Sequence, residues 1–217
     1  AFGPNRPPLH EIEVFEAAGH VKYMVQRRED LRGKSVVIAG GGDSAVDWAI
    51  SLADVASRIS VVHRRPKFRA APDSVRQMEA LAKDGKIELI IPYQLKALSG
   101  VRGKLNTVEV TTLDGDVRSL QADVLLAFFG LAMELGPVAE WGLNLERNLI
   151  RVDPATMQTS SEGIYAAGDI VDYPGKLKLI LSGFAETATA MHAARKYIRP
   201  EAAYHFEYST TQGLPEK

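Results

Sequence analysis

The sequence contains no cysteine among its 217 residues. This absence excludes a disulfide framework, thiolate metal sites and any dithiol redox relay. The five histidines, at positions 10, 20, 63, 192 and 205, show no metal-ligand spacing, so no metal site is expected. The sequence also lacks a Walker A motif and a G-x-S-x-G elbow, which leaves P-loop and serine-hydrolase chemistry without a candidate.

Long apolar runs and an excess of charge are missing as well. No apolar stretch approaches the length of a membrane span, and 26 basic residues balance 27 acidic ones to a formal net charge of −1. Neither nucleic acid nor a membrane is therefore expected as the main partner. The chain starts at Ala1 without Met or a signal-peptide pattern, so we expect a piece of a larger protein in a reducing, cytoplasmic compartment.

A glycine-rich turn follows the apolar run of residues 35–39, which is typical of a strand buried on both faces. A helical pattern and a second strand-like run, residues 59–62, come next, and together these segments predict a βαβ unit. In a G-x-G-x-x-A turn, the small residues allow a tight turn, backbone approach to a pyrophosphate, and close packing of helix on strand. A dinucleotide site is predicted; the alternative is a turn with only structural meaning. The turn consists of Gly40, Gly41, Gly42, Asp43, Ser44 and Ala45.

The second strand ends in the basic run HRRPKFR, residues 63–69. An NAD site places an Asp or Glu at this position to hold the ribose, and that carboxylate is absent here. The extra 2′-phosphate of NADP carries a charge of about −1.5 to −2 that arginine can bind with paired donors. We expect Arg64 and Arg65 to hold this phosphate, His63 to lie beside it and Arg69 to reach the phosphates; the alternative is an exposed basic turn.

The remaining pattern predicts an α/β fold. A short helix is expected within residues 9–18, a helix from Pro72 to Gly85, strands at 87–91 and 123–129, and three short strands between 94 and 120. Residues 131–163 look irregular, residues 163–169 look like a short strand that ends in Gly-Asp, and residues 180–198 look like a long helix. We expect a linker at 1–5, a nucleotide-binding domain at 6–129 and a further domain part at 130–217.

Two segments carry a resemblance to a known family. IAGGGDSAVDWA followed by VVHRRPKFRA resembles the NADPH domain of the thioredoxin-reductase-like flavoenzymes, and GIYAAGDIVDYPGKLKLILSGFAETATAMHAA resembles the C-terminal part of their FAD domain. The resemblance spans essentially the whole chain. It implies a Rossmann-type NADPH domain with a parallel sheet and a small antiparallel meander, followed by the C-terminal part of an FAD domain. NADP(H) and FAD are the implied cofactors.

The resemblance also implies roles for particular residues. Gly168 and Asp169 would contact the flavin ribityl chain, Ile180 or Leu181 would face the ring, and Gly130 would contact cofactor. The family's N-terminal glycine-rich unit for the FAD pyrophosphate does not precede Ala1, so a fragment is expected that holds FAD poorly. Hinges between the domains would match residues 3–8 and 130–135.

Thioredoxin reductases carry a Cys-x-x-Cys before the NADPH glycine turn, and the matching region, residues 20–25, has no cysteine. The branch without it is the ferredoxin/flavodoxin–NADP⁺ reductases, whose C-terminal extension places a ring on the flavin. HFEYSTTQG, residues 205–213, resembles that extension. It implies a stacking role for Tyr208, with Ser209, Thr210 and Thr211 near the flavin edge; the alternative is a frayed tail or an edge strand.

The implied activity is an enzyme that passes hydride from NADPH to FAD and single electrons to ferredoxin or flavodoxin, as a homodimer. An acidic ferredoxin would favour a basic docking face. The candidate patch, which an ordinary solvated face explains equally well, consists of Lys22, Arg27, Arg28, Arg32 and Lys34. Two other readings remain open: a non-enzymatic NADP-binding sensor module, and another cysteine-free NADPH-dependent flavin reductase of the same superfamily.

Overall fold

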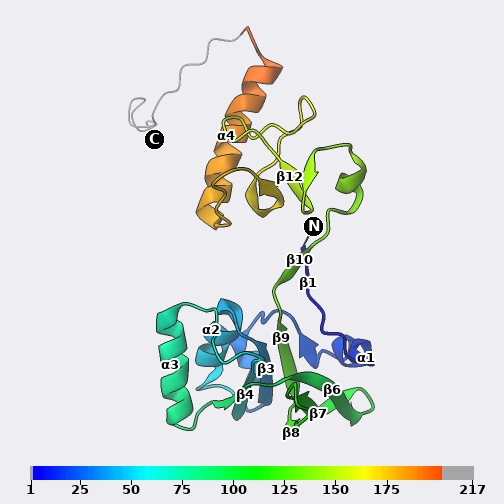
Figure 1. Cartoon of the computed structure of the whole chain (residues 1–217), viewed down its shortest axis with the longest axis vertical. Helices are drawn as coiled ribbons and strands as arrows, with labels where there is room; N and C mark the ends of the chain where they lie inside the picture. The colour runs from blue at the N-terminus through cyan, green and yellow to red at the C-terminus, as the bar shows by residue number, and fades with distance from the viewer. Residues whose placement is uncertain (1, 202–217) are drawn as a thin grey trace, which may run out of the picture. The chain divides into compact units, whose positions relative to one another are not determined.

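The computed structural model describes residues 2–201 of the chain (Figure 1). Contacts divide the chain into two compact units, residues 3–132 and residues 1–2 with 133–217. The domain limits expected from the sequence are 1–5, 6–129 and 130–217. These limits remain a prediction, because a division by contacts does not test them. The α/β class, the parallel sheet and the antiparallel meander are confirmed.

A parallel sheet of five strands forms the centre of the unit at 3–132, in the order β2-β9-β3-β4-β5. The first βαβ unit is the one that the apolar runs predicted, with Gly40 at the end of its first strand. Val37 pairs with Ser60 on one side and with Leu125 on the other, so β3 is the middle strand. The strands are β2 (Val21–Lys22), β3 (Ser35–Gly40), β4 (Arg58–Val62), β5 (Glu88–Ile90) and β9 (Val124–Phe128).

Both faces of this sheet are covered (Figure 1). Val36 and Ile38 of β3 pack toward the face that carries α2 (Asp43–Leu52) and α3 (Pro72–Lys83). Val37 and Ala39 pack toward α1 (Ile12–Ala17) and the meander. Burial on both faces explains why the strand is apolar at every position from Val36 to Ala39 rather than alternating. The meander consists of β6 (Gln94–Val101), β7 (Lys104–Thr111) and β8 (Val117–Gln121), and the 3₁₀ helix η1 spans Arg28–Leu31.

The unit that contains residues 133–201 has a core of its own around Leu135, Leu143 and Ile150. It holds a three-stranded sheet in the order β11-β12-β13 and the long helix α4 (Ile180–Ile198). The other elements are η2 (Gly136–Glu140), β11 (Leu145–Glu146), β12 (Leu149–Arg151), η3 (Gly168–Ile170) and β13 (Val171–Asp172). The strand β1 (Phe2–Pro4) pairs with β10 (Leu131–Met133), and the limits of the two units fall within these strands.

Two sequence expectations for this part are corrected. Residues 163–169 form no strand, but a single bridge from Tyr165 to Gln158, because the chain turns at Gly168 with φ 85° into η3. The segment 131–163, expected to be irregular, contains β11 and β12. These strands have two and three residues, too few for an alternating pattern to show in the sequence.

Candidate functional site

A cavity of about 810 Å³ lies along the carboxyl ends of the parallel strands in the unit at 3–132. Its lining includes the glycine turn after β3, the end of β4 and the segment after β9. Parallel strands bring their carboxyl ends to one edge, and a crevice there is the usual ligand site of an open α/β sheet. The volume lies in the range of pockets that bind cofactors.

The three glycines of the turn differ in what surrounds them. A Cβ on Gly40 would lie 2.6 Å from the carbonyl oxygen of Phe128, and one on Gly41 would lie 2.1 Å from Cε1 of His63. A Cβ on Gly42 would meet no protein atom within 4 Å. The first two glycines are therefore required by packing, whereas Gly42 leaves the backbone open at the start of α2. The N–H groups of a helix start favour an anion at such a place.

The basic loop after β4 is tied to the glycine turn. The backbone N–H of Arg69 donates to the carbonyl oxygen of Gly41 at 2.7 Å. The N–H of Ala71 donates to the Asp43 carboxylate at 2.8 Å. Asp43 therefore holds the loop, which gives a reason for an acid at the start of a helix whose N-terminus faces a candidate phosphate site. Turn and loop act as one structure.

The cations of this loop point to solvent. Arg64 and Arg69 are exposed and line the cavity, and Arg65 is exposed on the same loop. The structure thus brings Arg64 and Arg69 to the same cavity as the predicted turn, which includes Gly40 to Ala45. Their assignment to the 2′-phosphate stays a prediction.

His63 differs from the arginines beside it because it is buried, with 8% of its surface exposed. Its ring stacks on Phe68 with centroids 5.0 Å apart, and its Nε2 donates to the Lys67 carbonyl at 3.3 Å. Burial lowers the pKa of His63 below 6.5, and the nearby arginines lower it further. The imidazole therefore supports Gly41 and the loop from inside as a neutral group, while its edge reaches the cavity lining.

A second candidate site lies within the other unit, where the predicted flavin contacts are found. Gly168 and Asp169 begin η3, and a Cβ on Gly183 in α4 would lie 3.5 Å from the Gly168 Cα. Ile180 and Leu181, in the first turn of α4, are 83% and 77% exposed. The turn and the start of the helix thus lie together with apolar side chains free to contact a ligand. Tyr208 and Thr210 lie outside the described residues.

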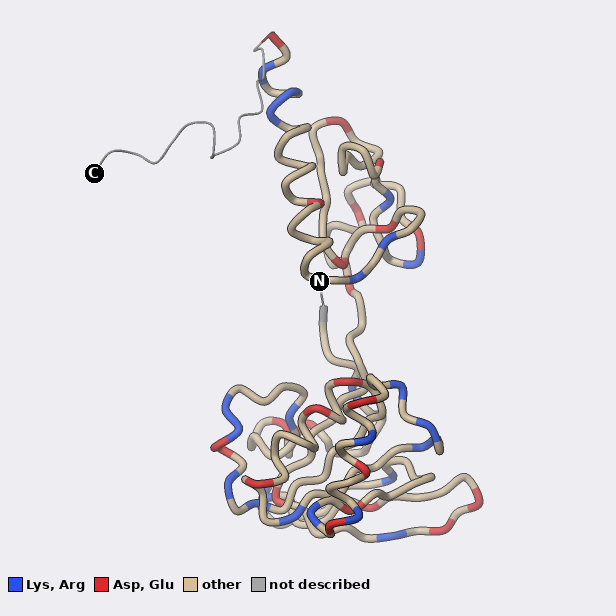
Figure 2. Tube along the Cα trace, turned by 90° about the vertical axis from the view of Figure 1, so that its left-hand side faces the viewer, with Lys and Arg blue, Asp and Glu red and all other residues tan. Residues whose placement is uncertain are grey.

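A buried carboxylate holds this turn. Glu186, the one acid of α4 (Figure 2), is 4% exposed and accepts hydrogen bonds from the Gly168 N–H at 2.7 Å and the Tyr173 hydroxyl at 2.6 Å. It also pairs with the ammonium group of Lys176, itself 5% exposed. Burial alone would raise the pKa of Glu186, but the hydrogen bonds from Lys176, Tyr173 and Gly168 lower it. Sequence reasoning missed this network; a single acid in an Ala-rich helix was the available signal.

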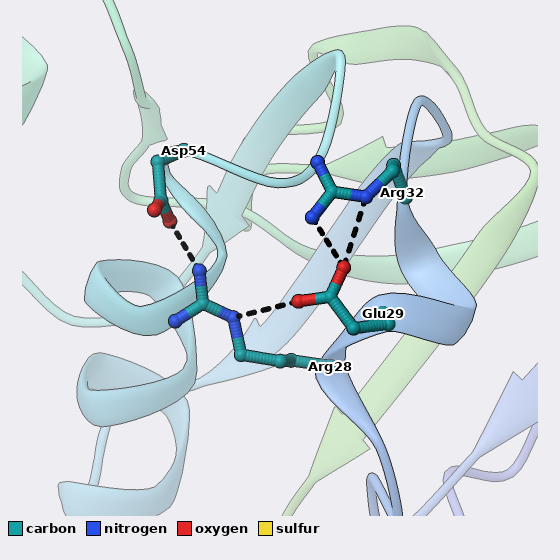
Figure 3. A network of polar contacts seen from close by, with 4 residues as sticks. All are labelled: Arg28, Glu29, Arg32 and Asp54. Atoms are coloured by element: carbon teal, nitrogen blue, oxygen red, sulfur yellow. Dashed lines mark hydrogen bonds and ion pairs between the residues drawn. The ribbon is translucent and has the colours of Figure 1, made fainter.

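The basic segment at 22–34 is largely neutralised by neighbouring acids (Figure 3). Arg28 bonds Asp54 at 2.7 Å and lies 3.6 Å from Glu29, which also accepts two bonds from Arg32. Arg27 pairs with Asp30 at 2.9 Å. The Arg28–Asp54 pair connects η1 to the loop after α2, and the other pairs are local to η1. The charges left to attract an acidic partner are mainly those of Lys22 and Lys34, so the segment is weak support for a docking face.

The cavity includes residues that the sequence analysis did not select. Phe128 ends β9, and Phe129 follows it next to the predicted Gly130. The carbonyl oxygen of Gly130 accepts a 3.0 Å hydrogen bond from the Asn5 N–H. Arg6 and Tyr23 line the same cavity. The two phenylalanines could have been predicted from the sequence, because the carboxyl end of every parallel strand reaches the sheet edge that the cavity follows. Nothing in the sequence joins Arg6 and Tyr23 to it.

Two further observations concern residues 2–201. No three side chains of the His, Asp and Glu type lie close enough together to hold a metal ion. No helix in this range combines the length and the apolar composition needed to cross a membrane.

The parallel sheet and the glycine turn indicate a dinucleotide-binding α/β protein. Comparison with known families identifies the family. Residues 2–195 match the family described as pyridine nucleotide-disulphide oxidoreductase, and the chain belongs to this family. A solved thioredoxin reductase from Lactococcus lactis, in the FR conformation, is similar with a TM-score of 0.78 at 24% identity, over 92% of this chain and 64% of that one. The resemblance stated from the sequence is thus confirmed for family and fold.

More similar relatives carry a more particular name. The ferredoxin–NADP reductase of Granulibacter bethesdensis is 61% identical over 215 residues, which are 99% of this chain and 61% of that protein. The ferredoxin–NADP reductase of Rhodospirillum rubrum is 63% identical over 215 residues, 99% of this chain and 62% of that protein. The chain therefore spans about three fifths of the length of these relatives.

Proposed function

We propose that the complete protein is a flavin-dependent oxidoreductase that transfers electrons between NADP(H) and ferredoxin. The family, and relatives that are named ferredoxin–NADP reductase, support this function. The observation that carries it is the hydrogen-bonded assembly of glycine turn and arginine loop around one cavity. In the proposed function, the turn binds the pyrophosphate and the loop binds the 2′-phosphate, and the lack of an acid at the end of β4 that would select NAD supports this assignment.

The residues present fit NADP(H) in this cavity. Gly42 leaves the backbone open to a pyrophosphate at the start of α2, and Arg64 and Arg69 supply positive charge at the cavity wall. In the proposed role, Arg64 and Arg65 bind the 2′-phosphate. His63 stays neutral at pH 7 because its pKa is lowered, and it keeps the loop against Gly41.

The residues at η3 and α4 fit FAD. Bound FAD would supply the conversion of a hydride into single electrons. Gly168 and Asp169 would hold its ribityl chain, Ile180 or Leu181 would cover the ring, and Gly130 would contact cofactor. The exposed apolar first turn of α4 and the Glu186 network, which fixes the Gly168 N–H, support this assignment.

Three finer features belong to the same proposal. Flavodoxin is a second acceptor, the complete protein is a homodimer, and Tyr208 stacks on the flavin with Thr210 near its edge. Tyr208→Ser is expected to change the hydride-transfer rate or the selectivity for NADPH over NADH, measured by stopped-flow reduction of the flavin. An unchanged rate and selectivity would remove Tyr208 from the site, and light scattering of the complete protein tests the dimer.

Ferredoxin-dependent reduction of cytochrome c by NADPH tests the function. The complete protein is expected to bind FAD and to reduce cytochrome c only when ferredoxin is added. Flavin reduction by NADPH without any effect of ferredoxin or flavodoxin would indicate another flavin reductase of the superfamily. NADP(H) binding by a complete protein that binds no flavin would indicate a sensor module.

A further inference from the structure

Three side chains form a polar cluster at one end of the cavity. Glu16 of α1 accepts hydrogen bonds from the guanidinium of Arg6 and from the hydroxyl of Tyr23, which follows β2. The Glu16 side chain is 13% exposed, whereas that of Arg6 is 55% exposed. Arg6 and Tyr23 line the cavity, and Glu16, which is not a lining residue, is hydrogen-bonded to both. The cluster carries one positive and one negative charge next to a neutral phenol.

The strand order indicates which part of a dinucleotide would reach this cluster. The glycine turn follows β3, with the end of β4 on one side and the ends of β9 and β2 on the other. A dinucleotide bound with its pyrophosphate at this turn extends in both directions. Because Arg64 and Arg65 follow β4, the adenosine half lies on that side. The nicotinamide half then extends past the ends of β9 and β2, where Tyr23 and Arg6 are found.

We propose that the Arg6–Glu16–Tyr23 cluster contacts the nicotinamide half of NADP(H) and sets the relative affinity for the oxidised and reduced forms. The inference rests on the proposed function, because it assumes that the cavity binds NADP(H). The nicotinamide ring is a cation in NADP⁺ and is neutral in NADPH. The charge of the cluster therefore acts on one form and not on the other.

The phenol of Tyr23 remains a neutral donor in this cluster. Burial raises the pKa of Tyr23, and the hydrogen bond to Glu16 raises it further. The hydroxyl is thus committed to Glu16, and the ring is left to contact a ligand. The face of an aromatic ring attracts a cation such as the oxidised nicotinamide ring. The charges of Glu16 and Arg6 add to this attraction or oppose it, and so determine how strongly the whole cluster binds the cation.

Two variants that each remove one charge are expected to act in opposite directions. Glu16→Gln leaves the cluster with a net positive charge and lowers the affinity for NADP⁺ relative to a neutral-ring analogue. Arg6→Gln leaves it with a net negative charge and raises that relative affinity. A unit charge near the rim of a solvated cleft should change the affinity ratio by about 3- to 10-fold, and added salt should reduce the change.

Calorimetric titration of the complete protein tests this with three ligands: NADP⁺, 1,4,5,6-tetrahydro-NADP, whose ring is neutral and donates no hydride, and 2′,5′-ADP, which lacks the nicotinamide half. The ratio of NADP⁺ to tetrahydro-NADP affinity is expected to fall in Glu16→Gln and rise in Arg6→Gln, with 2′,5′-ADP affinity unchanged. Arg6→Lys and Tyr23→Phe keep the net charge and serve as controls in which the ratio stays near wild type.

A structural role would give a different result. Both charge variants would then shift the ratio in the same direction or leave it unchanged, or would weaken 2′,5′-ADP as much as NADP⁺, and each of these outcomes overturns the inference. Arg6 is half exposed, so Arg6→Gln should fold and its result tests the direction alone. Wild-type protein that binds none of the three ligands would instead overturn the NADP(H) assignment itself.

Discussion

The backbone N–H of Arg69 donates a 2.7 Å hydrogen bond to the carbonyl oxygen of Gly41. This bond joins the loop that carries the arginines to the turn that faces the start of α2. The proposed pyrophosphate site and the proposed 2′-phosphate site would thus lie on one hydrogen-bonded assembly, which lowers the cost of ordering the loop when a nucleotide binds. Substitutions in the turn, in the loop and in α4 are expected to separate the contributions of these three elements.

Replacing Arg64 and Arg65 together by serine is expected to lower NADP⁺ affinity by about 10²- to 10⁴-fold. Each charge-assisted hydrogen bond to the phosphate contributes about 1.5–3 kcal/mol, and NAD⁺ has no such phosphate. Calorimetric titration with both nucleotides measures the difference. Arg58→Ser, at the opposite end of β4, is the matched control and should change neither affinity. An equal loss for NADP⁺ and NAD⁺ would show that the loop has a structural role only.

Two alanine substitutions in the glycine turn are expected to separate folding from binding. Gly41→Ala places a Cβ 2.1 Å from the His63 ring, so the free energy of unfolding should fall by about 1–3 kcal/mol. Gly42→Ala meets no protein atom within 4 Å and has φ −99°, so stability should be unchanged. Its methyl group instead occupies the approach of the pyrophosphate, and NADP⁺ affinity should fall at least 10-fold. Thermal unfolding and titration together check this; retained affinity in Gly42→Ala would place the pyrophosphate elsewhere.

Glu186→Ala is expected to destabilise the unit that contains α4. Removing the carboxylate leaves the buried ammonium of Lys176 unpaired and the Gly168 N–H without its acceptor, at a cost of about 3–5 kcal/mol. Thermal unfolding followed by flavin release should shift to lower temperature, while Glu162→Ala, an exposed acid of the same unit, should not shift it. An unchanged release temperature in Glu186→Ala would show that the network does not hold the turn at Gly168 for a bound flavin.

The lowered pKa of Glu186 also predicts a pH dependence. The unfolded chain then binds a proton at a higher pH than the folded protein does. The stability from this group is complete above the ordinary glutamate pKa and is lost as the pH falls through the folded value. Unfolding scans below pH 5 should therefore show a steeper loss in wild type than in Glu186→Gln, which cannot titrate. Parallel curves would contradict the pairing.

His63 predicts a second pH dependence, in a different range. Its pKa lies below the ordinary value of 6.5, so the unfolded chain takes up a proton first on acidification. Stability should begin to fall below about pH 6.5 and level off below the folded pKa. Nucleotide-free protein is required, because the 2′-phosphate titrates near pH 6. His63→Gln should lose this part of the pH dependence. His10→Gln is the control and should keep it, because the side chain of His10 is 92% exposed. A wild-type stability curve that is flat between pH 7.5 and 5.5 would show that burial does not lower the pKa of His63.

The local pattern of the sequence determined the βαβ unit and its glycine turn. Residues 36–39 are apolar at every position because β3 is covered on both faces, and that pattern is readable without coordinates. Ala45 follows from the same local geometry, since a Cβ on Gly40 would lie 3.0 Å from the Ala45 Cβ, whereas the 2.6 Å approach of Gly40 to the Phe128 carbonyl oxygen depends on the neighbouring strand β9. The arginine loop was readable because its distance from the turn is set by one helix and one strand.

Contacts between distant parts of the chain were decided by the tertiary structure. The sequence selected His63 for a phosphate, and the fold buries its ring against Gly41 and Phe68 because the loop folds back over the turn. The arginines at 22–34 looked like one basic patch, and their acidic partners include Asp54, which only the fold brings near. The sequence pattern shows which positions are buried and where charges lie along the chain. Which side chains from distant segments contact one another depends on the fold, because only the fold places the strand ends and loops next to each other.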